Sequence, residues 1–214
     1  MVRVIAVPVK SLSKAKHRLA PALSPIERGA LALAMLEDVL DATLAVPGWD
    51  TWVVSPDEVA LEVAARRGAL PISEAKPGLS AAIRQTEATA LEAGAAALAV
   101  VPGDLPLLTA EVLIFAFRTL GPVVVCRSTR DGTSLLLRRP PRAIRASFGP
   151  GSFRKHLELA EARGLPAAVV ERRELSFDLD VPDDILTLLA EGKRGRAREV
   201  CLDMDLAERL GVHA

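Results

Sequence analysis

The sequence lacks tyrosine and has few other aromatic residues, because phenylalanine, tryptophan and tyrosine together make up 3% of its 214 residues. Proteins that bind single-stranded nucleic acid stack the bases on aromatic side chains, so this scarcity argues against that function. The chain also lacks an excess of either charge, since 27 Lys and Arg residues balance 27 Asp and Glu residues. We therefore expect no general electrostatic attraction to nucleic acid or to an anionic membrane.

Cysteine is scarce, and the apolar runs are short. Cys126 and Cys201 fit neither a disulfide framework nor a zinc site, which favours a reduced, cytoplasmic setting. The N-terminal run 1–7 is too short for a signal peptide. The most apolar window, 93–108, is interrupted by two prolines and an aspartate, so we expect no segment that crosses a membrane.

The composition is that of a globular protein, with half of the residues hydrophobic and a quarter charged. The length suffices for one good-sized core, and neither an internal repeat nor a Gly- or Ser-rich linker divides the chain. We expect a single domain over 1–214, with a helical tail from about Gly192. Alternating strand and helix patterns predict a three-layer α/β/α sandwich over a Rossmann-like, mostly parallel mixed sheet.

Apolar runs between turn residues predict strands, and segments with helix-start signals predict helices. The predicted strands are 2–7, 51–54, 69–72, 97–101, 123–126, 134–137 and 167–170. The predicted helices are 25–44, 79–93, 153–163 and 182–189, with two more starting after Ser55–Glu58 and at Thr109. Ser24–Glu27 and Ser55–Glu58 both have the pattern of a capping box. The amphipathic segment 200–210 is expected to pack on the same domain or to form a homodimer with a second copy.

One buried strand is expected to deliver a carboxylate to a ligand site. The apolar run 97–101 is followed by Pro102 and Gly103, and Asp104 stands between this glycine and a leucine-proline pair. In an open α/β sheet, ligands bind beyond the carboxyl ends of the strands. A rigidly held acid there suits a divalent cation that carries phosphates. The alternative is that Asp104 is an ordinary loop or helix-capping residue.

A basic loop follows the first predicted strand. It contains Lys10, Lys16 and Arg18, and the latter two flank apolar residues that could anchor the loop. Arginine offers phosphate oxygens a planar fork of donors, and lysine offers a point charge. The loop therefore favours a phosphorylated ligand, the alternative being a solvated basic loop.

Two further acids, Asp178 and Asp180, lie in a segment that alternates apolar and acidic residues and so is expected to be a strand with both acids on one face. If they meet Asp104 at the strand ends, the three could hold one or two Mg²⁺ ions that bridge nucleotide phosphates. The alternative is that Asp180 caps the helix beginning near Pro182 and that Asp178 is exposed.

Two glycine-bearing turns, 131–133 and 148–152, could cradle a second phosphorylated ligand with backbone N–H groups and the hydroxyls of Thr133 and Ser152. The alternative is that both are ordinary turns. His156 follows Ser152 by four residues on the predicted helix, where it either faces the same anion or lies on the helix surface.

In combination and in this order, these stretches resemble the 2-phospho-L-lactate (or phosphoenolpyruvate) guanylyltransferases of coenzyme F-420 biosynthesis. That family belongs to the nucleotidyltransferases related to the molybdenum-cofactor guanylyltransferases. The resemblance spans about 4–189 and rests on seven short motifs: Val7-Pro8-Val9-Lys10, Ala15-Lys16-His17-Arg18-Leu19, Pro77-Gly78-Leu79-Ser80, Pro102-Gly103-Asp104-Leu105-Pro106, Asp131-Gly132-Thr133, Phe148-Gly149-Pro150-Gly151-Ser152-Phe153 and Asp178-Leu179-Asp180-Val181-Pro182.

The resemblance implies a fold of the nucleotide-diphospho-sugar transferase type and transfer of GMP from GTP to a phosphorylated three-carbon acid, with release of pyrophosphate. By that resemblance, Mg²⁺ is the cofactor, and Lys16, Arg18 and Asp104 are catalytic. The implied nucleotide-binding residues are Pro8, Lys10, Lys16, Pro77, Gly78, Leu79, Ser80, Pro102 and Gly103. The implied acceptor-binding residues are Thr133, Gly149 and Ser152, and the implied metal ligands are Asp104, Asp178 and Asp180.

Two positions depart from the family, which more often has asparagine where Ser80 and Ser134 stand. Phospholactate, phosphoenolpyruvate and phosphoglycerate are all compatible acceptors. Nucleotidyl transfer to a sugar phosphate or to molybdopterin is an alternative, although those relatives usually carry a Gly-Gly loop that Pro8-Val9-Lys10 lacks. A non-catalytic nucleotide-binding module is a further alternative, which missing metal carboxylates would indicate; all three are present.

Overall fold

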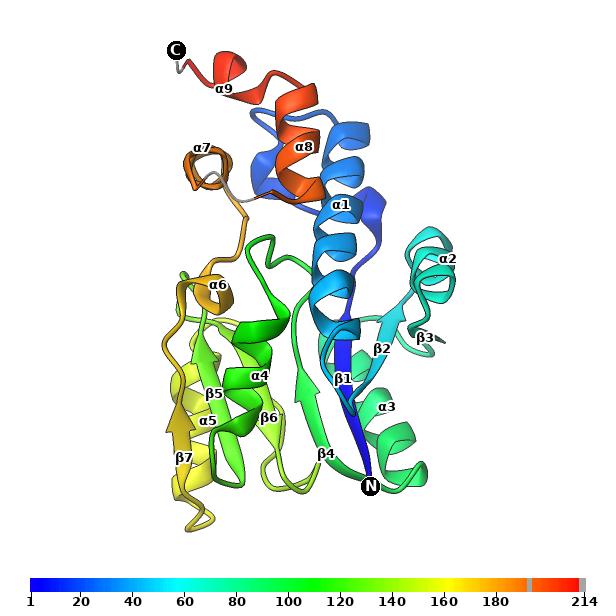
Figure 1. The fold of residues 1–214 in the computed structure, drawn as a ribbon, viewed down its shortest axis with the longest axis vertical. Helices are drawn as coiled ribbons and strands as arrows, with labels where there is room; N and C mark the ends of the chain where they lie inside the picture. Colours follow the sequence, from blue (N-terminus) through cyan, green and yellow to red (C-terminus); the bar gives the residue numbers. More distant parts are fainter. Residues whose placement is uncertain (192–193, 212–214) are drawn as a thin grey trace.

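The computed structural model describes residues 1–191 and 194–211. In this part of the chain one sheet has seven strands in the order β3-β2-β1-β4-β6-β5-β7 (Figure 1). The strand bounds are β1 Val2–Pro8, β2 Asp50–Ser55, β3 Leu70–Ser73, β4 Ala95–Val100, β5 Val123–Arg127, β6 Thr133–Arg138 and β7 Ala167–Val169. Strand β6 is antiparallel to both of its neighbours, and the remaining pairs are parallel, so the predicted mixed, mostly parallel sheet is confirmed.

Helices cover both faces of this sheet (Figure 1). Their bounds are α1 Pro25–Leu44, α2 Glu58–Arg67, α3 Leu79–Glu92, α4 Ala110–Arg118, α5 Ser152–Glu161, α6 Arg173–Ser176, α7 Pro182–Ala190, α8 Arg196–Asp203 and α9 Leu206–Arg209. Two short 3-10 turns, η1 Leu12–Lys14 and η2 His17–Leu19, interrupt the loop after β1. Among the described residues, none of the helices has both the length and the hydropathy that crossing a bilayer requires.

The strands alternate their side chains between two apolar layers. In β1, Ile5 and Val7 pack into the layer that includes α1, α2 and α4, whereas Val4 and Ala6 pack into the layer that includes α3. All four side chains are almost completely buried. Because successive residues of a strand point to opposite faces, a continuous apolar run is what a strand covered on both sides requires. The predicted three-layer sandwich is confirmed.

The chain changes direction across the sheet at β1 and β4. From β1 it builds outward through β2 and β3, and it then returns to place β4 on the other side of β1. The loops that leave the ends of β1 and β4 therefore diverge and leave a crevice between them, which is where open α/β sheets bind ligands. The topology therefore places the candidate site at the carboxyl ends of β1 and β4.

Local signals at the helix starts agree with the structure at one capping box and differ at the other. Ser24 Oγ accepts the Glu27 N–H and the Glu27 carboxylate accepts the Ser24 N–H, so the first box is formed at α1. The second prediction is wrong, because the N-cap of α2 is Asp57 and the Ser55 hydroxyl instead accepts the Asp57 N–H. Both residues are good caps, and α2 begins two residues later than the pattern indicated.

Two further predictions need correction. The segment 177–180 is not a strand, since it belongs to no ladder of the sheet. The amphipathic segment 200–210 is not one helix but is divided between α8 and α9. The predicted start of the tail at Gly192 lies outside the described residues. Asp38 of α1 holds this tail, because its carboxylate accepts the N–H groups of Arg196 and Ala197 at 2.7 and 2.9 Å.

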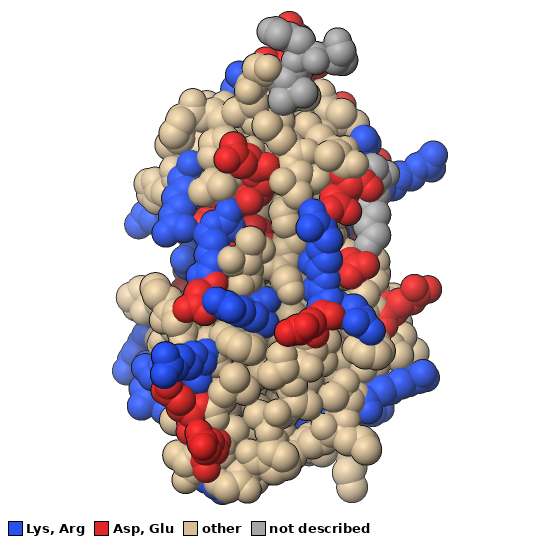
Figure 2. All heavy atoms as spheres, turned by 90° about the vertical axis from the view of Figure 1, so that its left-hand side faces the viewer, with Lys and Arg blue, Asp and Glu red and all other residues tan. Residues whose placement is uncertain are grey.

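The charges of the chain are mixed on the face formed by the left-hand side of Figure 1. Figure 2 shows lysine and arginine side chains lying beside aspartate and glutamate side chains across this face. The ion pairs of the structure include those of Arg173 with Glu191 and of Arg154 with Glu158. This distribution agrees with the balanced composition of the sequence.

Candidate active site

A cleft of about 500 Å³ opens at the carboxyl ends of β1 and β4. Gly103 allows the two loops to approach closely, because a Cβ there would lie 3.1 Å from Val9 Cγ2. Segments far apart in the sequence meet in this cleft. The predicted site residues that line it are Pro8, Lys10, Lys16, Arg18, Leu79, Pro102, Gly103, Asp104, Thr133, Gly149, Ser152, Asp178 and Asp180.

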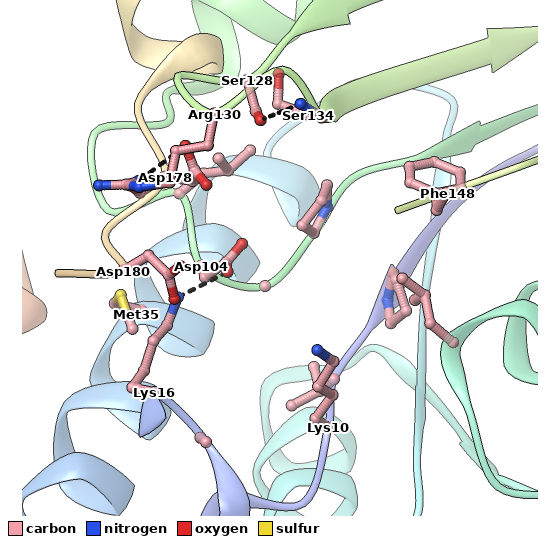
Figure 3. Close-up of a pocket in the computed structure, with 18 of the residues that line it drawn as sticks. Lys10, Lys16, Met35, Asp104, Ser128, Arg130, Ser134, Phe148, Asp178 and Asp180 are labelled. Atoms are coloured by element: carbon pink, nitrogen blue, oxygen red, sulfur yellow. Dashed lines mark hydrogen bonds and ion pairs between the residues drawn. The ribbon is translucent and has the colours of Figure 1, made fainter. Parts of the chain in front are cut away.

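Lys16 and Asp104 form the central ion pair of the cleft. Lys16 Nζ lies 2.7 Å from Asp104 Oδ2, and the lysine side chain is 8% exposed while that of the aspartate is 37% exposed (Figure 3). Lys16 has the left-handed backbone conformation, with φ +52°. A lysine in that region costs roughly 1 kcal/mol or more and persists where the surroundings fix it, a situation typical of functional sites. Lys16 is therefore folded into the cleft, whereas Lys10 and Arg18 line the cleft but remain exposed.

Asp178 lies near Asp104 and is supported by Arg130. Burial, and then the nearby Asp104 carboxylate, raise the pKa of Asp178 above its usual range. Arg130 Nη1 lies 3.6 Å from Asp178 Oδ1 and donates to the Asp178 backbone carbonyl at 3.1 Å. Asp184 in turn accepts from Arg130 Nη2 at 2.6 Å. The alternative that Asp178 is an exposed residue is therefore wrong.

The third predicted acid is paired at the rim of the cleft. Arg18 Nη1 donates to Asp180 Oδ2 at 2.8 Å, and the arginine side chain is 65% exposed. Asp180 does not cap α7 with its side chain, because Asp184 accepts the N–H groups of Asp180 and Val181 at 2.7 and 2.8 Å. An exposed ion pair of this kind contributes little to stability, so Arg18 and Asp180 can exchange partners when a ligand enters.

Asp104 and Asp178 could bind a divalent cation together with oxygens of a bound ligand. Among the described residues, protein side chains alone form a less complete set of metal ligands. Within residues 1–191 and 194–211, no three carboxylate, imidazole or thiol side chains are grouped as ligands of one metal ion. Asp104 and Asp178, however, are close enough for each charge to act on the other. Mg²⁺ in phosphoryl-transfer sites is commonly bound by one or two carboxylates together with substrate phosphates and water, which is the donor set this pair could complete.

A second polar group lines the same cleft through Thr133 and Ser152. Thr133 Oγ1 lies 2.9 Å from Ser152 Oγ and 3.0 Å from His156 Nδ1, and the Ser147 N–H donates to His156 Nε2 at 2.9 Å. His156 is fully buried, so its placement on the helix surface is wrong. Burial lowers the pKa of His156 to about 4, with further contributions from Arg138 and Lys155.

The start of α5 completes this polar group. Its N-cap is Gly151, which offers no side chain to the first N–H groups of the helix. Gly149 and Gly151 have φ of +130° and +67°, a conformation that favours glycine. An uncapped helix start with adjacent hydroxyls is suited to an anion. The turns 131–133 and 148–152 are therefore brought together, as predicted for a second ligand.

A second cleft, also of about 500 Å³, adjoins the first and shares Pro8, Val9, Lys10 and Leu79 with it. Pro77 and Gly78 line this second cleft, and Gly78 has φ +110° where the chain turns into α3. Ser80 is exposed and lines neither cleft, so the structure separates it from the other predicted nucleotide-binding residues.

Several residues of the cleft were missed by sequence reasoning. Arg130 and Ser128 follow β5 in a segment without a distinctive pattern, and Phe148 was read only as part of a turn. Asp184 had a signal, because an acid at the third helical position after Val181-Pro182 is a helix-start feature. That signal indicates a cap and gives no hint of the contact with Arg130.

The family model described as "Guanylyl transferase CofC like" matches residues 2–208, which is nearly the whole chain. The chain belongs to this family. A phosphoenolpyruvate guanylyltransferase of Rubrobacter xylanophilus is 43% identical over 190 residues, covering 87% of this chain and 93% of the relative.

Other relatives are named for different acceptor molecules. A 3-phospho-D-glycerate guanylyltransferase of Phenylobacterium zucineum is 42% identical, covering 89% of this chain and 91% of the relative. A 2-phospho-L-lactate guanylyltransferase of Archaeoglobus fulgidus is 36% identical, covering 91% and 87%. A crystal structure from Desulfovibrio desulfuricans G20, described as a candidate nucleotide-diphospho-sugar transferase, has a TM-score of 0.82 at 16% identity and covers 98% of both chains. The fold is of that type.

Proposed function

We propose that the protein transfers GMP from GTP to a phosphorylated three-carbon acid, with Mg²⁺ as cofactor and pyrophosphate as the second product. Membership of the guanylyltransferase family and the names of its relatives support the reaction class. The observation that carries the proposal is the first cleft, which acids and cations line together with the hydroxyls of Thr133 and Ser152 at the start of α5. Such a cleft is suited to two anionic ligands that must meet.

The two adjoining clefts suggest how GTP lies. Its base would enter the second cleft beside Pro77, Gly78 and Leu79, and its phosphates would extend past Lys10 toward Lys16. The acceptor would then occupy the opposite wall, with its phosphate near Thr133, Gly149 and Ser152. This arrangement points the acceptor phosphate toward the α-phosphorus of GTP.

The Asp104 and Asp178 carboxylates would hold Mg²⁺ together with phosphate oxygens. When bound, the ion supplies positive charge that offsets the phosphates. Lys16, now paired with Asp104, would then be released to donate to a phosphate oxygen. Arg18 can turn from Asp180 toward the same phosphates, since its side chain is largely exposed.

The chemistry requires charge compensation more than proton transfer. An oxygen of the acceptor phosphate attacks the α-phosphorus, the bond from that phosphorus to the bridging oxygen of pyrophosphate breaks, and pyrophosphate leaves. The attacking phosphate is already ionised at neutral pH, so no general base is needed. Two like unit charges at ~4 Å repel by about 4 kcal/mol at an effective dielectric constant near 20. Lys10, Lys16 and Arg18 are placed to offset several such pairs, and the cleft aligns the reactants.

The test is a mass-spectrometric assay of phospholactate, phosphoenolpyruvate and phosphoglycerate with GTP, ATP and CTP in the presence of Mg²⁺. We expect a guanylylated product from at least one acid, and we expect Asp104→Ala to abolish most pyrophosphate release. Asp183→Ala is the matched control, because Asp183 is an exposed acid at the start of α7. Undiminished turnover of Asp104→Ala would remove this aspartate from the mechanism, and guanylylation of none of the acids would refute the proposed function.

A further inference from the structure

A chain of hydrogen bonds runs from the 147 loop through His156 to the acceptor side of the first cleft. The Ser147 N–H lies 2.9 Å from His156 Nε2, His156 Nδ1 lies 3.0 Å from Thr133 Oγ1, and Thr133 Oγ1 lies 2.9 Å from Ser152 Oγ. Thr133, Ser152 and His156 are 5%, 1% and 0% exposed. Thr133 and Ser152 line the cleft. The chain therefore has one end in the protein and the other at the cleft.

The backbone fixes the direction of the first bond. A peptide N–H can only donate, so the Ser147 contact requires a lone pair on His156 Nε2. A histidinium ring would place N–H against N–H at this point. The ring is therefore neutral, and its single proton is on Nδ1. Consequently Nδ1 donates to Thr133 Oγ1.

Burial and neighbouring charges keep the ring in this state. Phe148 packs edge-on against it, with ring centroids 5.3 Å apart. Arg138 of β6 and Lys155 of α5 are the charged groups that act on it, and both disfavour an added positive charge.

The direction of the hydrogen bond between His156 Nδ1 and Thr133 Oγ1 determines whether the two hydroxyl groups present a proton or only lone pairs to the cleft. Thr133 and Ser152 have one hydroxyl proton each, and one of these two protons is used in the bond between them. If Nδ1 donates, the other hydroxyl proton remains for a ligand. If Nδ1 accepted instead, Thr133 would donate to the ring and Ser152 to Thr133, so that only lone pairs would face the cleft. Lone pairs repel an anion, whereas a hydroxyl proton binds it.

We propose that His156 is a positioning residue that keeps the Thr133–Ser152 pair a hydrogen-bond donor toward the phosphate group of the acceptor. The assignment of this anion to a phosphorylated acid rests on the proposed function. The direction of the hydrogen bonds rests on the Ser147 contact alone. The donor pair acts beside the uncapped start of α5, so backbone and hydroxyl donors converge on the same anion.

The tautomer can be measured directly. The sequence contains three histidines, His17, His156 and His213, so ring nitrogens are assigned with His156→Asn as reference. Long-range ¹H–¹⁵N spectra of the full-length protein at pH 7 are expected to show a protonated Nδ1 and an unprotonated Nε2 for His156. An Nε2–H tautomer would overturn the proposal whatever the enzymatic activity.

Ligand-binding and KM measurements distinguish a positioning role of His156 from a merely structural role. The probes are inorganic phosphate and phosphoenolpyruvate in calorimetry without GTP, and the KM values for acceptor and for GTP in turnover. His156→Leu removes the donor that orients the two hydroxyls, so that their free proton is no longer held toward the cleft; this is expected to weaken binding of both probes tenfold or more, with the KM for GTP changed less than twofold. His156→Asn can still offer an N–H to Thr133 and is expected to stay within threefold of the wild type. Leu157→Ala, which loosens the packing of α5 outside this chain of bonds, is the stability control.

The outcomes distinguish this proposal from the proposed function. If His156→Leu binds phosphate as the wild type does, or weakens GTP and acceptor equally as Leu157→Ala does, the positioning role is refuted while the transferase activity stands. If the wild type guanylylates none of the acids but binds phosphate in a His156-dependent way, the proposed function is refuted while the positioning role stands.

Discussion

The buried, neutral state of His156 makes stability depend on pH in a range where few other groups titrate. Its pKa is lowered from 6.5 to about 4 in the folded protein, chiefly by burial. As the pH falls below 6.5, the unfolded chain binds the proton first, so stability is lost between the two pKa values. At 1.36 kcal/mol per pKa unit, the full loss is about 3 kcal/mol, of which about 2 kcal/mol has occurred at pH 5. That is a large share of the ~5–15 kcal/mol that stabilises a typical domain.

Urea unfolding followed by circular dichroism at pH 7.5, 6, 5 and 4.5 measures this loss. Carboxylates also titrate at the lower end, so the informative quantity is the difference between the wild type and His156→Asn, which has no ring to protonate. We expect the wild type to lose about 2 kcal/mol more than His156→Asn between pH 7.5 and 5. His17→Asn is the control, because His17 is exposed. Parallel pH dependences of the wild type and His156→Asn would refute the reasoning.

Three further predictions concern Lys16, Asp184 and Ser24. Lys16→Met is expected to raise the KM for GTP tenfold or more, while thermal unfolding shifts little because the partly exposed Asp104 can be solvated; an unchanged KM would exclude Lys16 from phosphate binding. Asp184→Asn should cost about 1–3 kcal/mol in urea unfolding and raise the Mg²⁺ concentration needed for half-maximal activity, because Arg130 loses its second carboxylate. Ser24→Ala should cost about 1 kcal/mol through loss of the α1 cap with kcat/KM unchanged, because Ser24 does not line either cleft; a change in kcat/KM would contradict the separation of this cap from the site.

Much of the fold follows from local pattern. The buried strands β1 and β4 are apolar runs of strand length, and the start of α1 is marked by a complete capping box. In such places composition, periodicity and capping agree, which is when local reasoning is dependable. The acidic segment 177–180 alternates with period two but pairs with no strand, because alternation by itself does not supply a partner. Only the sheet itself decides whether a partner strand is present.

The site was predictable in outline because Lys16 and Asp104 follow β1 and β4, and these parallel strands end at the same edge of the sheet. Contacts between loops were not predictable. Arg130 reaches both Asp178 and Asp184 across a long sequence separation, and no pattern near Arg130 marks it. The role of His156 also depends on the Ser147 backbone, which is brought to it by the turn into α5. Such pairings depend on loop paths, which sequence periodicity does not encode.

The Leu179 N–H donates to the Asp104 carbonyl at 3.3 Å, so the two acid-bearing loops are joined through their backbones. This hydrogen bond couples the positions of the two loops, and with them those of Asp104 and Asp178. Substitutions in the two loops should consequently show less than additive effects on activity. Replacing Leu179 with proline, which removes this N–H, would test whether the loops act independently once uncoupled.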